Sequence, residues 1–168
     1  MKYMGSKNRI ARFILPMMIK EANEKGITTW VEPFVGGGNM IDKVPNSFRR
    51  IGADINPYLI QALVSIRDCA NELPKNNKEF TEVNYNELRK NDNYKHKGYA
   101  GFALSYGGKW LGGWCRDGLN KRDYVTESYK NAQKQTTKLQ GVEFINKSYL
   151  DLELSGNSLI YCDPPYEG

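Results

Sequence analysis

The sequence of 168 residues has little of the chemistry that metal sites and disulfide frameworks need, since it contains one histidine and three cysteines. Cys69, Cys115 and Cys162 are odd in number and lack the paired spacing of zinc ligands, and His96 stands alone. We therefore expect no metal site. Free thiols suit a reducing compartment, which favours the cytoplasm.

The sequence also lacks an apolar run long enough to span a bilayer. The run FILPMMI (13–19) follows several basic residues, as the core of an export signal does. However, Pro16 interrupts it, and Lys20 and Glu21 follow it with no small-residue cleavage site. We interpret this run as the buried face of a helix and expect no membrane partner.

The composition that is present predicts a folded, basic protein. Apolar residues make up 40% of the chain, with 3 Trp, 11 Tyr and 6 Phe, which excludes a disordered chain. The net charge of +5 is unevenly spread, since residues 1–50 and 84–140 are basic whereas residues 51–83 and 141–168 are acidic. A basic stretch is typical of proteins that bind a polyanion, although it also fits a solvated surface.

Apolar patterning predicts an α/β domain with an insertion. Apolar spacing predicts a helix that starts near Ser6 and ends at Gly26, and β-branched and aromatic residues predict strands at 28–35 and 49–55. Further helices are predicted at 56–70, 77–90 and 123–139, and further strands at 142–146 and 158–163. The order of these elements divides the chain into a nucleotide-binding domain, 1–70 and 141–168, and an insert, 71–140.

Three consecutive glycines, Gly36–Gly38, directly follow the first predicted strand. Glycines there permit a tight turn and a close approach of the backbone to a ligand. Asp54 ends the next strand, twenty residues past Phe34, where nucleotide-binding domains place a carboxylate for ribose hydroxyls. Without that partner, a plain strand-ending turn would explain the glycines equally well.

Glu32 at the end of the first strand favours one kind of ligand. Its negative charge would repel a pyrophosphate but would tolerate a cation. S-adenosylmethionine has no phosphate and carries a sulfonium, and its amino acid tail needs a cation for its carboxylate. Lys7 is a candidate for that role, and the alternative is an exposed lysine ahead of a helix.

The stretch LIYCDPPYEG (159–168) places Asp163 at the carboxyl end of an apolar strand, where open α/β sheets bind ligands. Because proline has no N–H, Asp163 and the Pro164 carbonyl form two acceptors with no donor between them. An exocyclic amine, with two N–H bonds to donate, would match them, and Tyr166 would stack on a base that has left the duplex. The alternative is a rigid turn that ends a strand.

Four motifs together resemble the Dam-like DNA adenine-N6 methyltransferases. They are KYMGSK (2–7), VEPFVGGG (31–38), ADINPYL (53–59) and IYCDPPY (160–166), and they occur in the order of that family. The stretch SYGGKWLGGW (105–114) is similar to the insert of phage-type members. The resemblance implies a Rossmann-like S-adenosylmethionine-dependent sheet with a mostly helical target-recognition insert, acting on double-stranded DNA.

The resemblance also implies roles for individual residues. The target adenine would be bound and oriented by Asp163, Pro164, Pro165 and Tyr166. The cofactor S-adenosylmethionine would be held by Tyr3, Lys7, Glu32, Phe34, Gly36, Gly38 and Asp54.

The insert interleaves basic and aromatic residues between 94 and 124. Cations that meet phosphates and aromatic rings that stack or wedge suit DNA. The candidates for DNA contact are Lys95, Lys97, Lys109, Trp110, Arg116, Lys121 and Arg122. The alternative is a small aromatic core with a solvated basic rim.

Two departures from the family pattern carry expectations of their own. The family often has an acidic residue near Ser148, and Asp151 is the nearest one here. The family also continues past its DPPY motif, so the sheet is expected to be incomplete, with 158–163 as an exposed edge strand that promotes self-association. The competing hypotheses are an inactive remnant that only binds cofactor or DNA, and a methyltransferase for RNA or a protein side chain.

Overall fold

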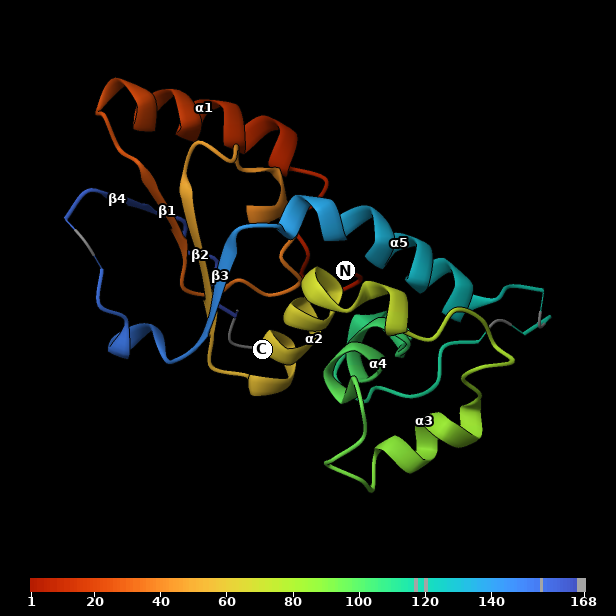
Figure 1. Cartoon of the computed structure of the whole chain (residues 1–168). Helices are drawn as coiled ribbons and strands as arrows, with labels where there is room; N and C mark the ends of the chain where they lie inside the picture. Colours follow the sequence, from red (N-terminus) through yellow and green to blue (C-terminus); the bar gives the residue numbers. More distant parts are fainter. Residues whose placement is uncertain (117, 120, 155, 166–168) are drawn as a thin grey trace.

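The computed structural model describes residues 1–116, 118–119, 121–154 and 156–165. Its centre is a parallel sheet of four strands in the order β3-β2-β1-β4 (Figure 1). The strands are β1 (Thr29–Glu32), β2 (Arg49–Asp54), β3 (Val142–Asn146) and β4 (Ser158–Ile160). Within the sheet Val31 pairs with Ile51 on one side and with Ile160 on the other. The predicted Rossmann-like α/β fold is confirmed, and the carboxyl ends of all four strands lie at one edge.

Five α-helices accompany the sheet in the described part of the chain: α1 (Ala11–Glu24), α2 (Pro57–Asp68), α3 (Glu82–Leu88), α4 (Lys97–Ala103) and α5 (Tyr124–Leu139). Helix α2 packs on β2 and β3, and both α4 and α5 pack on α2 (Figure 1). The start of α2 is fixed by Pro57 at its first position and by Asn56, whose side chain accepts from the backbone N–H groups of Tyr58 and Leu59.

The main hydrophobic core joins the sheet to helices of the predicted insert. Trp30 of β1 and Leu63 of α2 are fully buried, and the same cluster contains Tyr99 of α4 and Leu139 of α5. A second, smaller core unites α3 and α4 around Phe80, Tyr85, Leu88, Ala100, Leu104 and Val125. Residues 71–140 thus have a core of their own, yet two of their helices, α4 and α5, also join the main core by packing on α2.

The contact between α2 and α4 is close enough to require glycine. A Cβ atom added at Gly98 would lie 2.0 Å from the carbonyl oxygen of Tyr58. One turn further along α4, a Cβ atom at Gly101 would lie 2.2 Å from the ring of Trp110, which itself stacks on Tyr58 of α2. These two glycines let one face of α4 pack closely on α2 and on Trp110.

The predicted helices and strands occur in the predicted order. β3 matches its predicted bounds, whereas β4 ends at Ile160, three residues earlier than predicted. Helix α4 lies in a stretch for which no helix was predicted. β4 is an outer strand of the sheet, as predicted, and its Ile160 is 44% exposed.

Candidate active site

A cavity of about 490 Å³ lies at the carboxyl edge of the sheet. Its walls come from five separate segments: residues 3–7, the glycine loop after β1, the end of β2, the turn after β3, and the chain after β4. The predicted residues that line it are Tyr3, Lys7, Glu32, Phe34, Gly36, Asp54, Asp163, Pro164 and Pro165. The structure therefore brings the candidates for cofactor binding and for base binding to one cavity. Tyr166 lies outside the described residues.

The glycine loop lies directly under the ring of Tyr3. Gly36 has φ +51°, and a Cβ atom there would lie 2.9 Å from the Tyr3 ring. Gly38 has φ +67° and does not line the cavity; a Cβ atom there would lie 3.0 Å from Leu63 of α2. Gly36 thus allows the Tyr3 ring to approach the loop closely at the cavity. Gly38 instead allows the loop to pack closely on Leu63 of α2.

Glu32 is a buried carboxyl at the floor of the cavity. It is 2% exposed, and its Oε1 accepts a hydrogen bond of 2.9 Å from the indole N–H of Trp30. Burial raises the pKa of Glu32 to about 8, although the Trp30 hydrogen bond favours the charged form. The carboxyl is therefore mostly neutral at pH 7, and a cation placed beside it would promote its ionisation.

Asp54 is held in position by backbone groups at the end of β2. Its Oδ1 accepts from the backbone N–H of Asn56 at 2.9 Å. Burial raises the pKa of Asp54, and hydrogen bonds from the backbone N–H groups of Asn56, Gly36 and Ile55 act in the opposite direction. Because Gly36 is one of these donors, the glycine loop and the Asp54 carboxylate form one hydrogen-bonded unit.

Lys7 and Asp163 form an ion pair across the cavity. The Lys7 Nζ atom lies 2.8 Å from Asp163 Oδ2, and each side chain is 21% exposed. Pro164 and Pro165 continue the same wall. The pair joins the segment before α1 to the segment after β4. It therefore links two parts of the cavity wall that are far apart in the sequence.

Several further residues line the cavity without having been predicted as site residues, namely Asn39, Met40, Ser148, Tyr149 and Tyr161. The ring centres of Tyr149 and Phe34 lie 5.2 Å apart, which makes an aromatic wall. Ser148 and Tyr149 directly follow β3, so their place after a strand was the signal that could have indicated them. Asp151 does not line the cavity; at this turn the cavity meets Ser148, whose hydroxyl accepts from the Leu150 N–H.

The predicted DNA-binding residues fall into two groups. Lys97 is 2% exposed, its Nζ atom lies 2.8 Å from Asp92, and Trp110 stacks on Tyr58 with ring centres 4.5 Å apart. These two side chains hold the insert against α2. The other five are exposed cations, Lys95, Lys109, Arg116, Lys121 and Arg122.

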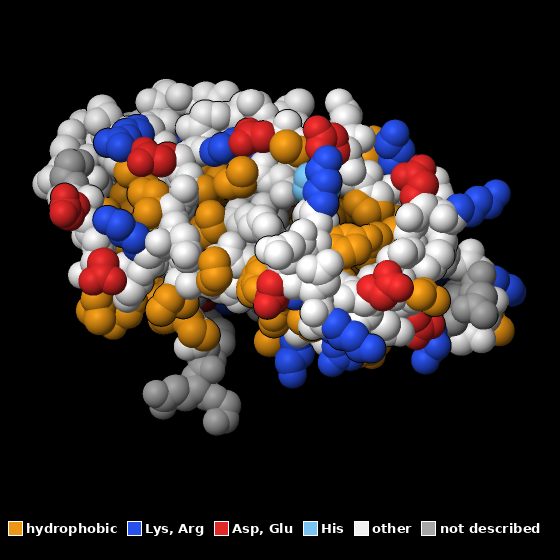
Figure 2. Space-filling view, turned by 60° about the horizontal axis from the view of Figure 1, so that its bottom comes forward, with side chains coloured by type: hydrophobic (Ala, Val, Ile, Leu, Met, Phe, Trp, Pro, Cys, Tyr) orange, Lys and Arg blue, Asp and Glu red, His pale blue; other side chains and the backbone are white. Residues whose placement is uncertain are grey.

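Several of the exposed cations have carboxylate partners. Lys95 pairs with Glu72, and Arg116 pairs with Glu82. Cationic and anionic side chains are interspersed on the face shown in Figure 2. Ion pairs of this kind on a surface are weak, so these cations remain able to exchange partners.

The described residues contain no group of three or more His, Cys, Asp or Glu side chains that could hold a metal ion. The histidine ring of His96 instead contacts the Ser65 hydroxyl, with Nδ1 and Oγ 3.2 Å apart. No helix formed by the described residues is both long and apolar enough to cross a bilayer.

A parallel sheet with a glycine loop, a carboxylate after the second strand and a DPP segment at one edge is the arrangement expected of a Rossmann-like methyltransferase. The family model of the D12 class N6 adenine-specific DNA methyltransferases matches residues 3–104, more than half of the chain. The chain belongs to this family. It is an enzyme, a DNA adenine methyltransferase that acts on DNA and requires a methyl donor, and the predicted Dam-like resemblance is confirmed.

The match takes in the glycine loop, Asp54 and the first part of the insert, while the ion-pair partner Asp163 lies beyond it. None of the curated proteins matches the chain.

Proposed function

We propose that the enzyme uses S-adenosylmethionine as its donor and methylates the exocyclic amine of an adenine flipped out of double-stranded DNA. The observation that carries this proposal is the single cavity that joins Gly36, Asp54 and Asp163. When bound, S-adenosylmethionine supplies an electrophilic methyl group on its sulfonium.

The lining of the cavity fits this donor. Asp54, fixed by three backbone N–H groups, would accept the ribose hydroxyls. Glu32 would favour the positive charge of the donor, and Lys7 would bind its carboxylate. Gly36 and Phe34 would line the donor, with Tyr3 and Gly38 supporting the loop. A volume of about 490 Å³ lies within the range of small-molecule sites.

The segment after β4 orients the adenine. The Asp163 carboxylate and the Pro164 carbonyl accept the two N–H bonds of the amine, and Pro165 contributes no competing N–H. Held in this way, the nitrogen becomes more tetrahedral and its lone pair is aimed at the donor. Positioning of this kind supplies several kcal/mol, on the order of what proximity effects give. Tyr166 is proposed to stack on the flipped base.

The insert contacts the DNA in this proposal. Residues 1–70 and 141–168 hold the cofactor and the base, while residues 71–140 carry the exposed cations Lys95, Lys109, Arg116, Lys121 and Arg122 toward phosphates. Lys97 and Trp110 act from inside the insert, by keeping α4 against α2.

Two further properties belong to the proposal. The outer position of β4 and the exposure of Ile160 favour self-association of the chain along this edge. Cys69, Cys115 and Cys162 are free thiols, which suits an enzyme of the cytoplasm.

The experiment is a transfer of labelled methyl from S-adenosylmethionine to an unmethylated duplex. The wild type is compared with Asp163→Ala and with a matched control, Asp151→Ala, which removes a carboxylate outside the cavity. Label on adenine N6, lost only in Asp163→Ala, is the expected result. Donor binding without transfer in the wild type would instead indicate a remnant, and label on RNA or on a protein would contradict the DNA assignment.

A further inference from the structure

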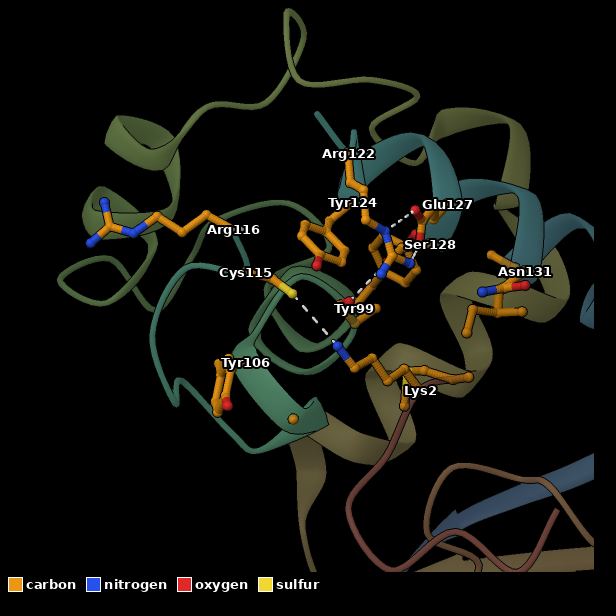
Figure 3. Close-up of a pocket in the computed structure, with 15 residues that line it drawn as sticks. Lys2, Tyr99, Tyr106, Cys115, Arg116, Arg122, Tyr124, Glu127, Ser128 and Asn131 are labelled. Atoms are coloured by element: carbon orange, nitrogen blue, oxygen red, sulfur yellow. Dashed lines mark hydrogen bonds and ion pairs between the residues drawn. The ribbon is translucent and has the colours of Figure 1, made fainter. Parts of the chain in front are cut away.

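A second cavity, also of about 490 Å³, lies in the insert rather than at the edge of the sheet. Figure 3 shows it between residues 1–2, the loop after α4, and α5. Of its lining residues, the proposed methyl transfer uses only Arg116 and Arg122, which are proposed to meet DNA phosphates. Its size lies in the range of small-molecule sites, so its lining can indicate what it would bind.

The lining of this second cavity is cationic. Lys2, Arg116 and Arg122 contribute positive charges, and Glu127 is the carboxylate among the described lining residues. Both oxygens of Glu127 accept hydrogen bonds from Arg122, at 2.8 and 2.6 Å. The charge of Glu127 is thus largely balanced by Arg122, and a positive charge remains at Lys2.

Lys2 has no salt bridge among the described residues. Its Nζ atom lies 3.5 Å from Cys115 Sγ and 5.7 Å from the centre of the Tyr124 ring. A thiol and an aromatic ring satisfy an ammonium far less than an anion does. Figure 3 shows Lys2 extending across the cavity toward Cys115.

Aromatic and hydroxyl groups complete the lining. Tyr106 is 71% exposed at the cavity, and the Tyr124 ring lies 4.7 Å from the Arg122 guanidinium. Tyr99, which also lines the cavity, has a buried hydroxyl with no hydrogen-bond partner in the part of the chain that the structure describes. An anion together with a flat ring would match the ammonium and the tyrosines.

From these contacts we infer that the second cavity binds a single nucleotide unit, with its phosphate at Lys2 and its ring against Tyr106 or Tyr124. An intact duplex is too wide to enter a cavity of this volume, so the unit is either a free nucleotide or a nucleotide displaced from the stack of the DNA. Both sources present the same phosphate and ring.

Neighbouring residues at the start of the chain line the two cavities, although the cavities have no described lining residue in common. Tyr3 turns its ring toward Gly36 in the first cavity, while its neighbour Lys2 faces the second. A Cβ atom at Gly108 would lie 2.9 Å from the Tyr3 backbone, so the loop after α4 packs tightly on this segment. A ligand bound at Lys2 would thus lie next to Tyr3, the residue whose ring packs on the glycine loop at Gly36.

The test uses thymidine 5′-monophosphate, because thymine has no exocyclic amine for Asp163. Binding is measured by calorimetry at low salt with the first cavity saturated by S-adenosylmethionine, and again without it. We expect binding in both cases, at least about tenfold weaker in Lys2→Gln, since a charge-assisted hydrogen bond is lost. Lys2→Arg should restore it, and Lys20→Gln, which changes an exposed lysine on α1, should leave it unchanged. Thymidine without phosphate should not bind.

A second arm distinguishes the source of the nucleotide. A duplex with one bulged thymidine is compared with the fully paired duplex, for the wild type and Lys2→Gln. A preference for the bulge that depends on Lys2 supports a nucleotide of the DNA, and binding of the monophosphate alone supports a free nucleotide. The inference is overturned if neither binds, or if Lys2→Gln binds both as the wild type does. Methyl transfer is measured separately, so its failure would not be confused with failure here.

Discussion

The ammonium of Lys7 lies 2.8 Å from the carboxylate of Asp163, and this ion pair joins two motifs at opposite walls of the cofactor cavity. Each group has a proposed partner in the reaction: the donor carboxylate for Lys7 and the adenine amine for Asp163. The pair therefore holds both side chains in place until their partners arrive. Donor binding would exchange one carboxylate for another at Lys7, which leaves Asp163 available to the amine.

Replacing Lys7 by Met should weaken the binding of S-adenosylmethionine. Loss of a charge-assisted contact corresponds to about a 10- to 100-fold increase in the dissociation constant of S-adenosylmethionine. Calorimetry of donor binding measures this directly. Lys20→Met, which removes an exposed lysine that pairs with Glu24, serves as the control. Equal affinities for wild type and Lys7→Met would remove Lys7 from the cofactor site.

Replacing Asp163 by Asn should separate binding from transfer. The single-turnover rate is expected to fall on the order of 10²- to 10³-fold, as when one oriented polar group is removed from an active site. Donor affinity should not decrease, because Lys7 then has no competing carboxylate at 2.8 Å. A variant that loses donor affinity and transfer in parallel would contradict the division of roles between the two residues.

Donor affinity should rise with pH because of Glu32. Its pKa of about 8 in the empty protein reflects burial first, with Asp42 and Asp163 adding to it and Trp30 and Lys43 opposing it. A cationic donor favours the ionised form, so binding releases a proton and tightens between about pH 6 and 8. In Glu32→Gln the affinity should be nearly independent of pH over this range. A wild-type profile that is flat would exclude Glu32 as the group that meets the positive charge.

The same group has the opposite effect on stability. Below pH 4.5, the ordinary value for Glu, the carboxyl is protonated in both the folded and unfolded states. Between 4.5 and about 8 only the folded state keeps the proton, so the contribution of Glu32 to the free energy of unfolding falls as pH rises. Thermal denaturation across this range should show the wild type losing stability relative to Glu32→Gln as the pH rises.

Replacing Gly98 by Ala should destabilise the whole protein. A Cβ atom 2.0 Å from the Tyr58 carbonyl forces α4 away from α2, at a cost of about 3 kcal/mol, the upper range for overpacking. Gly118→Ala is the matched control, because a Cβ atom there meets nothing within 4 Å. Chemical denaturation of both variants measures the difference. A loss similar in size for the two would show that the contact tolerates a methyl group.

The order of the strands and most of the predicted residues that line the cavity at the carboxyl edge were predictable because their signals are local. Three glycines after a strand, Asp54 after the next, and Asp163 after the last all lie at carboxyl ends, and a parallel sheet brings such ends to one edge. Ser148 and Tyr149 follow the same rule, but their residue types carry no specific chemistry, so their position after β3 is a weak signal that the fold makes clear.

Helix α4 was not predictable from local signals. Its sequence, KGYAGFA, is rich in glycine and aromatic residues, which have low helix propensity. Tertiary packing favours the helix here, because Gly98 and Gly101 let one face of α4 approach Tyr58 of α2 and the Trp110 ring closely. The burial of Lys97 was not predictable from local signals either, because a lysine in a basic stretch predicts a surface residue. Only the tertiary structure places Asp92 and Tyr58 around its ammonium.

Because Trp30 donates a hydrogen bond to Glu32, the fluorescence of Trp30 should respond to the charge of this carboxyl. The indole ring is fully buried and touches the carboxyl that should ionise when a cation enters the cavity. The emission of Trp30 will therefore report donor binding without any attached dye. The other two tryptophans, Trp110 and Trp114, lie in the insert, and replacing them by Phe isolates the signal of the cofactor cavity.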